Sequence, residues 1–421
     1  MATGTDPDLT FEDVDWDAEQ EHPLIDRSPV FLAQVVINAV IFGALIWDYF
    51  ILNNESPTIE GLHYPAIGGD SLIGLGFWEL RRPVLQFTTN GIEMTTTFSV
   101  WDVTSVEWLL MVVLAFGFFN VVVPLYQNQR MTAYYWRQFK KNKAAVASLV
   151  FLIVTFVIGF VGPVFLPPPE LSLTEQYLPP MGVTAQPPGY AEPISGTLAH
   201  PLGTDHQGQD MLKLVIFGMR VSMQVGLLSM SIAVGIGTLV GTTAAHAGGI
   251  VDEVLMRYVD IQSTFPVFLL LLLLIYLYGG SLILIIALYG FFGWEGIARQ
   301  VRSEALQKNE EAYIQASEAA GASQWWIVRR HIIPNTSSTI ITAATLAIPA
   351  FILGEATLSF LGFADPEIYS WGQVIAGGRG DLRGAPWIST VPGFFLFFMV
   401  LAFNYLGDAL RDSIDPRQEQ E

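Results

Sequence analysis

The sequence predicts an all-α polytopic membrane protein with about eight transmembrane helices. Hydrophobic residue types make up 52% of the 421 residues and charged types only 14%, whereas soluble domains carry roughly 25% charged residues. A spanning helix needs roughly 20 mostly apolar residues. The segments that approach or exceed this length are Phe31–Leu52, Trp108–Tyr126, Val146–Leu166, Val221–Ala245, Phe265–Tyr278, Leu282–Arg299, Ile340–Leu361 and Val391–Leu406.

The fifth and sixth segments are separated only by Gly279-Gly280-Ser281. One uninterrupted helix through both would be too long for a single crossing. We therefore favour a tight helical hairpin over one long buried run.

Basic residues set the expected orientation, because cytoplasmic loops carry an excess of Lys and Arg. With eight spans, 14 of the 20 basic residues fall on the same side as both chain ends. The densest cluster occupies one short loop and comprises Arg130, Arg137, Lys140, Lys141 and Lys143. We predict a multi-pass protein of the cell membrane with both termini in the cytoplasm.

Acidic residues give the chain a net charge of −19. Residues 1–30 hold nine acids against Arg27 alone, and residues 418–421 end the chain with further acid. We interpret 1–30 as an acidic cytoplasmic tail. A halophilic host, whose salt screens self-repulsion, explains the acidic loops best, and an interaction tail is the alternative. Nucleic acid is not an expected partner, because binding it needs a basic face.

Two long loops lie on the outer side of this topology. Residues 53–107 contain Asn90-Gly91 and a β-rich run from Met94 to Val100, which predicts a small extracytoplasmic cap with some strand content. The second loop, 167–210, contains three clusters of proline and is expected to be irregular. Residues 31–129 would thus form two spans flanking the loop 53–107.

The cytoplasmic segment 300–335, here called the coupling loop, is the most informative stretch. Strong helix formers run from Ser303 to Ala320, and Gly321 interrupts them. Ser323 could cap a second helix that runs to His331. The expected pattern on this second helix places three residues on one face: Trp325, Val328 and Ile332. The alternative is a pair of amphipathic helices lying flat on the bilayer.

The coupling loop resembles the cytoplasmic motif of ABC-importer permeases, which has the form Glu-Ala-Ala, three residues, Gly, nine residues, and Ile-x-Leu-Pro. Gln315-Ala316-Ser317, Gly321 and His331-Ile332-Ile333-Pro334 keep that spacing throughout. The sequence departs from the motif at four positions: Gln315 for Glu, Ser317 for Ala, His331 for Ile and Ile333 for Leu. Gln315 removes the charge that the motif carries at its first position.

The resemblance extends over residues 130–417 and is to the permeases of dipeptide, oligopeptide and nickel importers. The segments that carry it are His200-Pro201-Leu202-Gly203-Thr204-Asp205 with Gly208-Gln209-Asp210, then Gly248-Gly249 to Pro266, Leu353 to Gly362, Ser370-Trp371-Gly372, and Ala402 to Arg417. The family has Arg where Gln209 stands. The resemblance implies a six-span permease core preceded by two extra spans.

The same resemblance implies the partners. A second permease subunit would complete the pathway, two ABC ATPase subunits would dock on the coupling loop, and an extracytoplasmic binding protein would deliver peptides, nickel or a similar small solute. The docking residues would be Tyr313, Gln315, Ala316, Ser317, Gly321, Trp325 and Pro334. No lysine follows a glycine, so the chain lacks a P-loop. We expect no enzymatic activity and no cofactor in this chain, with ATP and Mg held by the partners.

Two further constellations leave alternatives open. His200, Asp205 and His206 could hold a metal, but a structural turn at the membrane entry is the better interpretation. Glu355 lies deep in the seventh segment, where a charge either lines the substrate pathway or bonds to a neighbouring subunit. A stand-alone secondary transporter or channel is the competing function, although such proteins commonly show inverted repeats and we find none.

Overall fold

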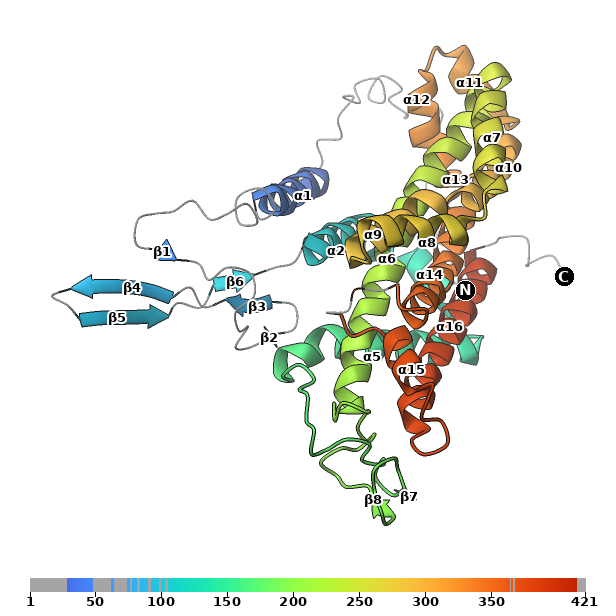
Figure 1. Cartoon of the computed structure of the whole chain (residues 1–421). Coiled ribbons are helices and arrows are strands. Elements are labelled where there is room, and N and C mark those ends of the chain that lie inside the picture. Colours follow the sequence, from blue (N-terminus) through green and yellow to red (C-terminus); the bar gives the residue numbers. More distant parts are fainter. Residues whose placement is uncertain are drawn as a thin grey trace, which may run out of the picture.

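The computed structural model describes residues 29–47, 105–363, 365 and 368–414 and six strands between residues 62 and 102. The expected tails, 1–30 and 418–421, lie outside these residues except for Pro29 and Val30, which begin α1. The helices are α1 (Pro29–Trp47), α2 (Ser105–Gly117), α3 (Val123–Gln127), α4 (Gln129–Phe139), α5 (Lys143–Phe165), α6 (Met211–Ala247), α7 (Gly249–Thr264), α8 (Val267–Tyr278), α9 (Leu282–Phe292), α10 (Glu295–Asn309), α11 (Ala312–Ala319), α12 (Gln324–Ile327), α13 (Ile333–Asn335), α14 (Ser337–Phe360), α15 (Trp371–Gly378) and α16 (Trp387–Ile414), with π-helical turns η3 (Phe118–Val122) and η4 (Val328–Ile332) (Figure 1).

The predicted membrane-spanning character is confirmed. Within the described residues, six helical stretches are long and apolar enough to cross a membrane: Val106–Gln127, Lys143–Pro163, Met211–Ala247, Leu282–Asn309, Ser337–Phe360 and Trp387–Ser413. The pair α7 and α8 makes a seventh candidate, bent by 73° at its break. The first expected span contains a shorter apolar helix, Leu32–Gly43. These elements agree with a count of about eight.

Several expected spans have different bounds in the structure, and the fourth and fifth show local causes. The fifth, Phe265–Tyr278, is only the second half of the bent α7–α8 pair, and Pro266 stands at the bend, where a missing N–H interrupts a helix. The fourth begins at Met211 rather than Val221, because Asp210 caps the helix there. With 37 residues, α6 is roughly 55 Å long. It therefore extends beyond a hydrocarbon layer of about 30 Å.

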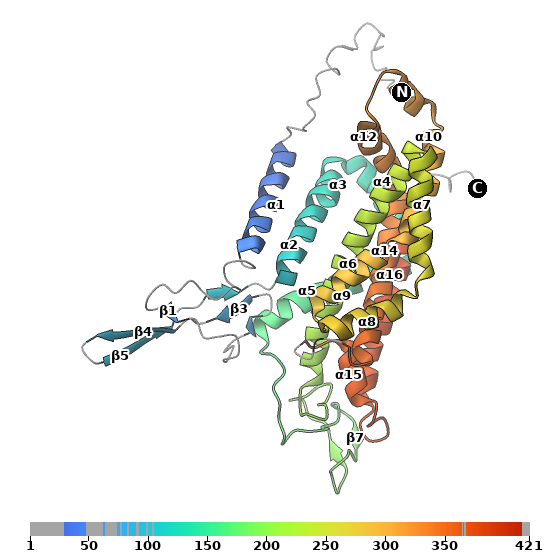
Figure 2. The same cartoon turned by 45° about the horizontal axis from the view of Figure 1, so that its top comes forward.

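The core is built around α6, which lies at the centre of the bundle against α5, α9, α10 and α14 (Figure 2). Glycine allows its close contact with α10: a Cβ on Gly241 would lie 2.6 Å from the carbonyl oxygen of Ala298. Small residues of this kind let membrane helices approach each other closely. The break expected at Gly279-Gly280-Ser281 separates α8 from α9.

The segment between α1 and α2 contains the strands that the sequence predicted. They are β1 (Leu62–His63), β2 (Gly74–Leu75), β3 (Trp78–Arg81), β4 (Val84–Thr89), β5 (Ile92–Thr97) and β6 (Val100–Asp102). The antiparallel sheets have the orders β1-β4-β5 and β2-β3-β6 and lie beside the helices (Figure 1). Thr89 pairs with Ile92 across Asn90-Gly91, a sequence that favours two-residue hairpins. The loop 167–210 is irregular apart from the short pair β7 (Thr184–Ala185) and β8 (Ile194–Ser195).

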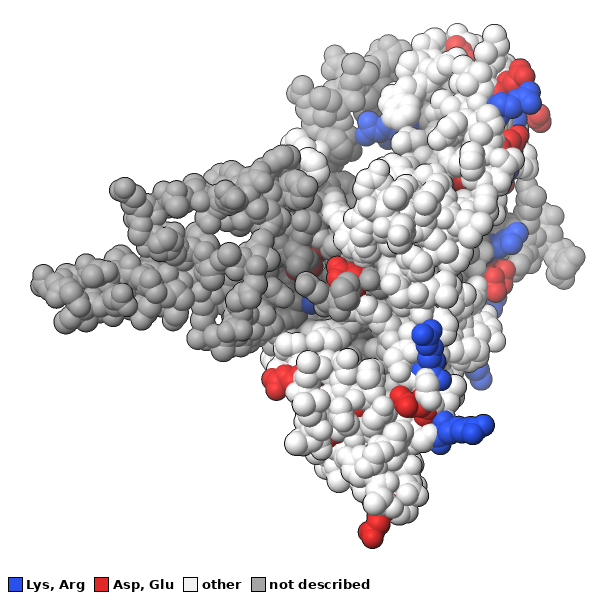
Figure 3. Space-filling model, in the orientation of Figure 1, with Lys and Arg blue, Asp and Glu red and all other residues white. Residues whose placement is uncertain are grey.

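The lateral surface of the bundle is apolar over much of its area. Leu269, Leu273 and Leu277 of α8 are more than half exposed. Figure 3 shows a broad surface over α8 that carries no charged side chains. Such a surface is suited to lipid or to another membrane subunit rather than to water.

Candidate functional site

The coupling loop is anchored on the end of α6 by Asn309, the last residue of α10. The Asn309 side-chain amide donates a hydrogen bond to the carbonyl oxygen of Ala245 at 2.7 Å. Its Oδ1 lies 3.2 Å from Nδ1 of His246. The expected continuous helix from Ser303 to Ala320 is therefore wrong. It is divided into α10 and α11, because Glu311 adopts an extended conformation and this long-range contact overrides local helix propensity.

The second part of the loop agrees with the prediction. Gly321 has φ of +85°, a conformation that glycine adopts without steric cost. The Ser323 hydroxyl then accepts a hydrogen bond from the backbone N–H of Trp326 at 3.3 Å and caps α12. The helix continues through η4 to Ile332. The chain thus makes two short helices around Gly321, here called the elbow.

The buried face of the elbow differs from the expected one. Ile314, Ile327 and Ile332 are at most 1% exposed and pack with Val328 against Ala245 of α6 and Ala305 of α10. Trp325 was expected to share one face with Val328 and Ile332, but it is 58% exposed while those two are buried. The π-helical turn explains the difference, because its wider period brings residues five apart into line.

The residues expected to contact the ATPases lie mostly on the opposite, exposed side. Tyr313, Gln315, Ala316, Gly321, Trp325 and Pro334 are exposed. Ser317 is half-buried, and its hydroxyl donates to the Tyr313 carbonyl oxygen at 2.8 Å. Partial burial, followed by the nearby Glu311 carboxylate, raises the pKa of Tyr313 above its ordinary value. Its hydroxyl is therefore a hydrogen-bond donor at neutral pH.

His331 has a position in the elbow that the sequence did not reveal. Its ring lies edge-on to Tyr313 at 5.7 Å and to Trp326 at 4.9 Å, measured between ring centroids. Its Nε2 lies 3.4 Å from the Ser317 hydroxyl. His331 therefore joins α11 to η4 at the position where the family motif has Ile. The substitution itself was the only sequence signal.

The outer segment, with His200, Gly203, Asp205 and Asp210, forms a compact turn. His200 Nδ1 and Asp210 Oδ2 are 2.8 Å apart, and Asp210 Oδ1 accepts the backbone N–H groups that begin α6. Asp205 Oδ1 accepts two further backbone N–H groups at 2.8 Å each. Burial raises the pKa of Asp205, although these backbone hydrogen bonds act in the opposite direction.

Gly203 fixes the close approach in the same turn. Its φ is +81°, and a Cβ there would lie 2.6 Å from the carbonyl oxygen of Leu178. The hydrogen bonds of His200, Asp205 and Asp210 are thus those of a structural turn. Among the residues with described side chains, no group of three or more His, Asp or Glu has the arrangement of a metal site.

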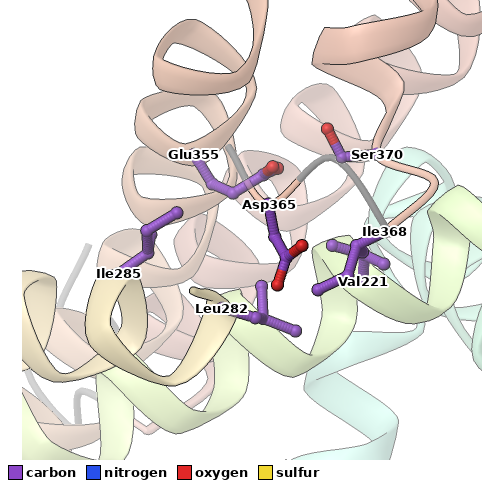
Figure 4. Close-up of a pocket in the computed structure, with 7 residues that line it drawn as sticks. All are labelled: Val221, Leu282, Ile285, Glu355, Asp365, Ile368 and Ser370. Carbon is purple, nitrogen blue, oxygen red and sulfur yellow. The ribbon is translucent and has the colours of Figure 1, made fainter. Parts of the chain in front are cut away.

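Glu355 lies inside the subunit, on α14. It is 1% exposed, and Ser359 on the next turn donates a hydrogen bond to its Oε1. It lines a small pocket together with Val221, Leu282, Ile285, Asp365, Ile368 and Ser370 (Figure 4). These residues come from α6, α9, α14 and the segment before α15. The pocket brings Glu355 and Asp365 to one place, which the sequence did not predict.

The sequence matches a known family of membrane transport proteins. Residues 234–420 match the family described as binding-protein-dependent transport system inner membrane component. Over 282 residues, the chain is 35% identical to the oligopeptide transport system permease protein OppC of Haemophilus influenzae, covering 67% of this chain and 87% of that protein. The chain belongs to this permease family. Residues 130–187 of the permease also match the N-terminal TM domain of oligopeptide transport permease C.

Other relatives agree. The permease is 37% identical over 287 residues to the dipeptide transport system permease protein DppC of Bacillus subtilis, covering 67% of this chain and 84% of that protein. Among solved structures, an inward-facing conformation of the MetNI methionine ABC transporter has a TM-score of 0.42 at 21% identity. The superposition covers 49% of this chain and 98% of the transporter chain.

Proposed function

We propose that this permease forms half of the translocation pathway of an ATP-driven ABC importer for peptides. The names of its relatives, which are oligopeptide and dipeptide permeases, support the substrate class. Nickel, the other cargo that the sequence resemblance implied, has no such support among the relatives named above. Peptide recognition would be divided between this subunit, a second permease and an extracytoplasmic binding protein.

The observation that carries the proposal is the elbow. Its inner face is packed against α6 and α10, while its outer face exposes Tyr313 and Trp325. A partner that pushes on the outer face would therefore move the ends of the spanning helices with it. Such a rigid element transmits a conformational change when the two states differ in packing energy.

ABC ATPases are the partners that fit this arrangement. The chain has no glycine followed by lysine, so it has no P-loop of its own. ATP and Mg would be held by two ATPase subunits on the cytoplasmic side, where the excess of basic residues also places both termini. The permease would lie in the cell membrane and would not itself be an enzyme.

The chain divides into parts with different roles under this proposal. Residues 130–417 would be the permease domain, and 31–129 would be an accessory unit with two spans and the loop 53–107 outside the cell. Residues 1–30 and 418–421 would be acidic ends. Val106 and Leu110 of α2 are buried in the common core. Their burial supports an accessory unit that is bound to its own subunit.

Reconstituted transport tests the proposal. The affinity-purified complex would be placed in vesicles with a labelled oligopeptide and its co-purified binding protein. Uptake that requires ATP, and that survives collapse of sodium and proton gradients, is the expected result. Uptake driven by either gradient without ATP would instead establish the alternative, a secondary transporter.

A further inference from the structure

A basic, aromatic surface on α4 is not used by the proposed transport mechanism. The helix Gln129–Phe139 lies between α3 and the membrane-spanning α5. Its last residue, Phe139, is 5% exposed and packs against Ala145 of α5 and Ala409 of α16. The C-terminal part of α16 is at the same end of the bundle as the coupling loop, and Figure 2 shows α4 close to that end.

The charge of this surface is unusual for the chain. Residues 108–169 contain no Asp or Glu, although the whole chain has 39 acidic residues and 20 basic ones. All the basic residues of α4, of the turn that follows it and of the start of α5 are exposed: Arg130, Arg137, Lys140, Lys141 and Lys143. The segment that carries this surface therefore contributes only positive charge to an otherwise acidic protein.

These basic residues also differ in their partners from most basic residues of α6, α7 and α10. In those helices an acidic side chain lies within 4.0 Å of each of the following: Arg220, Arg257, Arg299, Arg302 and Lys308. No ion pair among the described residues involves the basic residues of α4 or of the start of α5. Asp408 and Asp412 of the neighbouring α16 are exposed and do not pair with them. The cationic groups are thus available to an external anion.

Aromatic side chains accompany the charges. Trp136 is 43% exposed and stacks on Phe139 at 5.6 Å, and the Lys140 ammonium lies 5.5 Å from the Trp136 ring centroid. Trp and Tyr are enriched where a protein crosses the headgroup region, and Lys and Arg extend their charges from apolar stems toward it. The arrangement matches a helix that lies in the membrane interface.

We propose that α4 and the first turn of α5 form a binding site for the headgroups of anionic phospholipids. The phosphate groups would contact Arg137, Lys140 and Lys141, while the exposed Trp136, held by its stacking on the buried Phe139, would reach the acyl region beside α16. A lipid fits better than an acidic protein, because the helix joins two apolar segments and its buried end packs on membrane helices. Each basic residue near an anionic surface strengthens binding roughly fivefold.

Lipid titration of the full-length protein tests this site. The permease is purified in an uncharged detergent, and binding of phosphatidylglycerol and of phosphatidylcholine is measured by native mass spectrometry. We expect wild type to prefer phosphatidylglycerol. K140Q/K141Q should weaken that binding roughly 25-fold and leave phosphatidylcholine binding unchanged, whereas K140R/K141R should bind as wild type does.

A matched control removes the same charge elsewhere. Arg379 and Arg383 are exposed in the segment that joins α15 to α16. R379Q/R383Q should retain phosphatidylglycerol. If K140Q/K141Q fails to fold, R130Q/R137Q replaces it with the same expected loss. The proposal is overturned if the α4 variant binds phosphatidylglycerol like wild type, or if the control loses binding equally. It is also overturned if the α4 variant loses co-purifying ATPases while its lipid binding stays intact.

Discussion

Arg220 of α6 forms an ion pair with Glu107 of α2, and the Glu107 side chain is 1% exposed. Val106 and Leu110 on either side of Glu107 belong to the main hydrophobic core. A charge inside a membrane bundle is costly unless it is paired. The pair therefore attaches the accessory helix α2 to the permease core.

Removing one member of this pair should destabilise the protein. Glu107→Ala leaves Arg220 without its buried counter-ion, and breaking a buried pair in this way costs about 3–5 kcal/mol. We expect a lower thermal unfolding temperature in detergent and faster proteolysis between α1 and α2. The double variant E107L/R220M removes both charges and should recover most of the loss. Equal instability of the single and double variants would show that the pair itself contributes little.

Gly203→Ala should destabilise the outer turn. An alanine there adopts a φ of +81° and places its Cβ 2.6 Å from the Leu178 carbonyl oxygen, and strain of this kind costs about 1–3 kcal/mol. Gly189 is the control, because its φ is +86° and a Cβ there would contact nothing within 4 Å. Thermal unfolding should be lowered clearly more by G203A than by G189A. A similar decrease in both variants would mean that backbone strain alone acts at Gly203.

Asp205 should make stability depend on pH in a defined direction. Burial raises the pKa of its carboxyl in the folded state above the ordinary value of an aspartate, so the folded state holds its proton to a higher pH than the unfolded state does. Its contribution to stability is therefore present at low pH and is lost as pH rises through that interval. Asp205→Asn keeps an oxygen acceptor and should abolish this contribution. Thermal unfolding of both forms between about pH 3 and 7 checks it; a constant difference between them contradicts it.

His331 should be replaceable by the residue that the family motif has at its position. His331→Ile restores an apolar contact between α11 and η4, whereas His331→Ala removes the contacts with Tyr313 and Trp326. We expect H331A to lower peptide uptake per ATP hydrolysed several-fold, and H331I to stay near wild type. Both ratios come from reconstituted complexes. An unchanged ratio in H331A would exclude His331 from coupling.

The spans and the elbow could be predicted from the sequence because their signals are local. Apolar length marks a span, and Gly321 followed by Ser323 marks a break and a cap. The division of the first elbow helix could not be predicted, because it depends on the contact of Asn309 with Ala245, which are far apart in the chain. The bend at Pro266 was not predicted either, because the fifth span was expected to begin at Phe265.

The interior of the candidate sites was also beyond the sequence. Nothing in either segment indicates that Glu107 meets Arg220, or that Asp365 shares a pocket with Glu355. Such pairs are decided by which faces of the helices pack together. The separation of Trp325 from the buried Val328 and Ile332 likewise depends on a π-helical turn, which no residue pattern specifies.

Docking of ATPases on the elbow can be tested by comparing two glycines of the same backbone conformation. Gly321 and Gly362 both have φ of +85°, and at both positions a Cβ would contact nothing within 4 Å. Gly321 lies in the elbow, whereas Gly362 follows the far end of α14. A tryptophan therefore imposes the same backbone strain at either position. The two variants differ only in the part of the structure that receives the tryptophan.

Tagged wild type, G321W and G362W would be purified in mild detergent and high salt, and their partners identified by mass spectrometry. We expect a second permease and ABC ATPases to accompany wild type and G362W. G321W should keep the second permease and lose the ATPases. Retention of the ATPases by G321W, or their absence from wild type, would show that the elbow does not hold the ATPases.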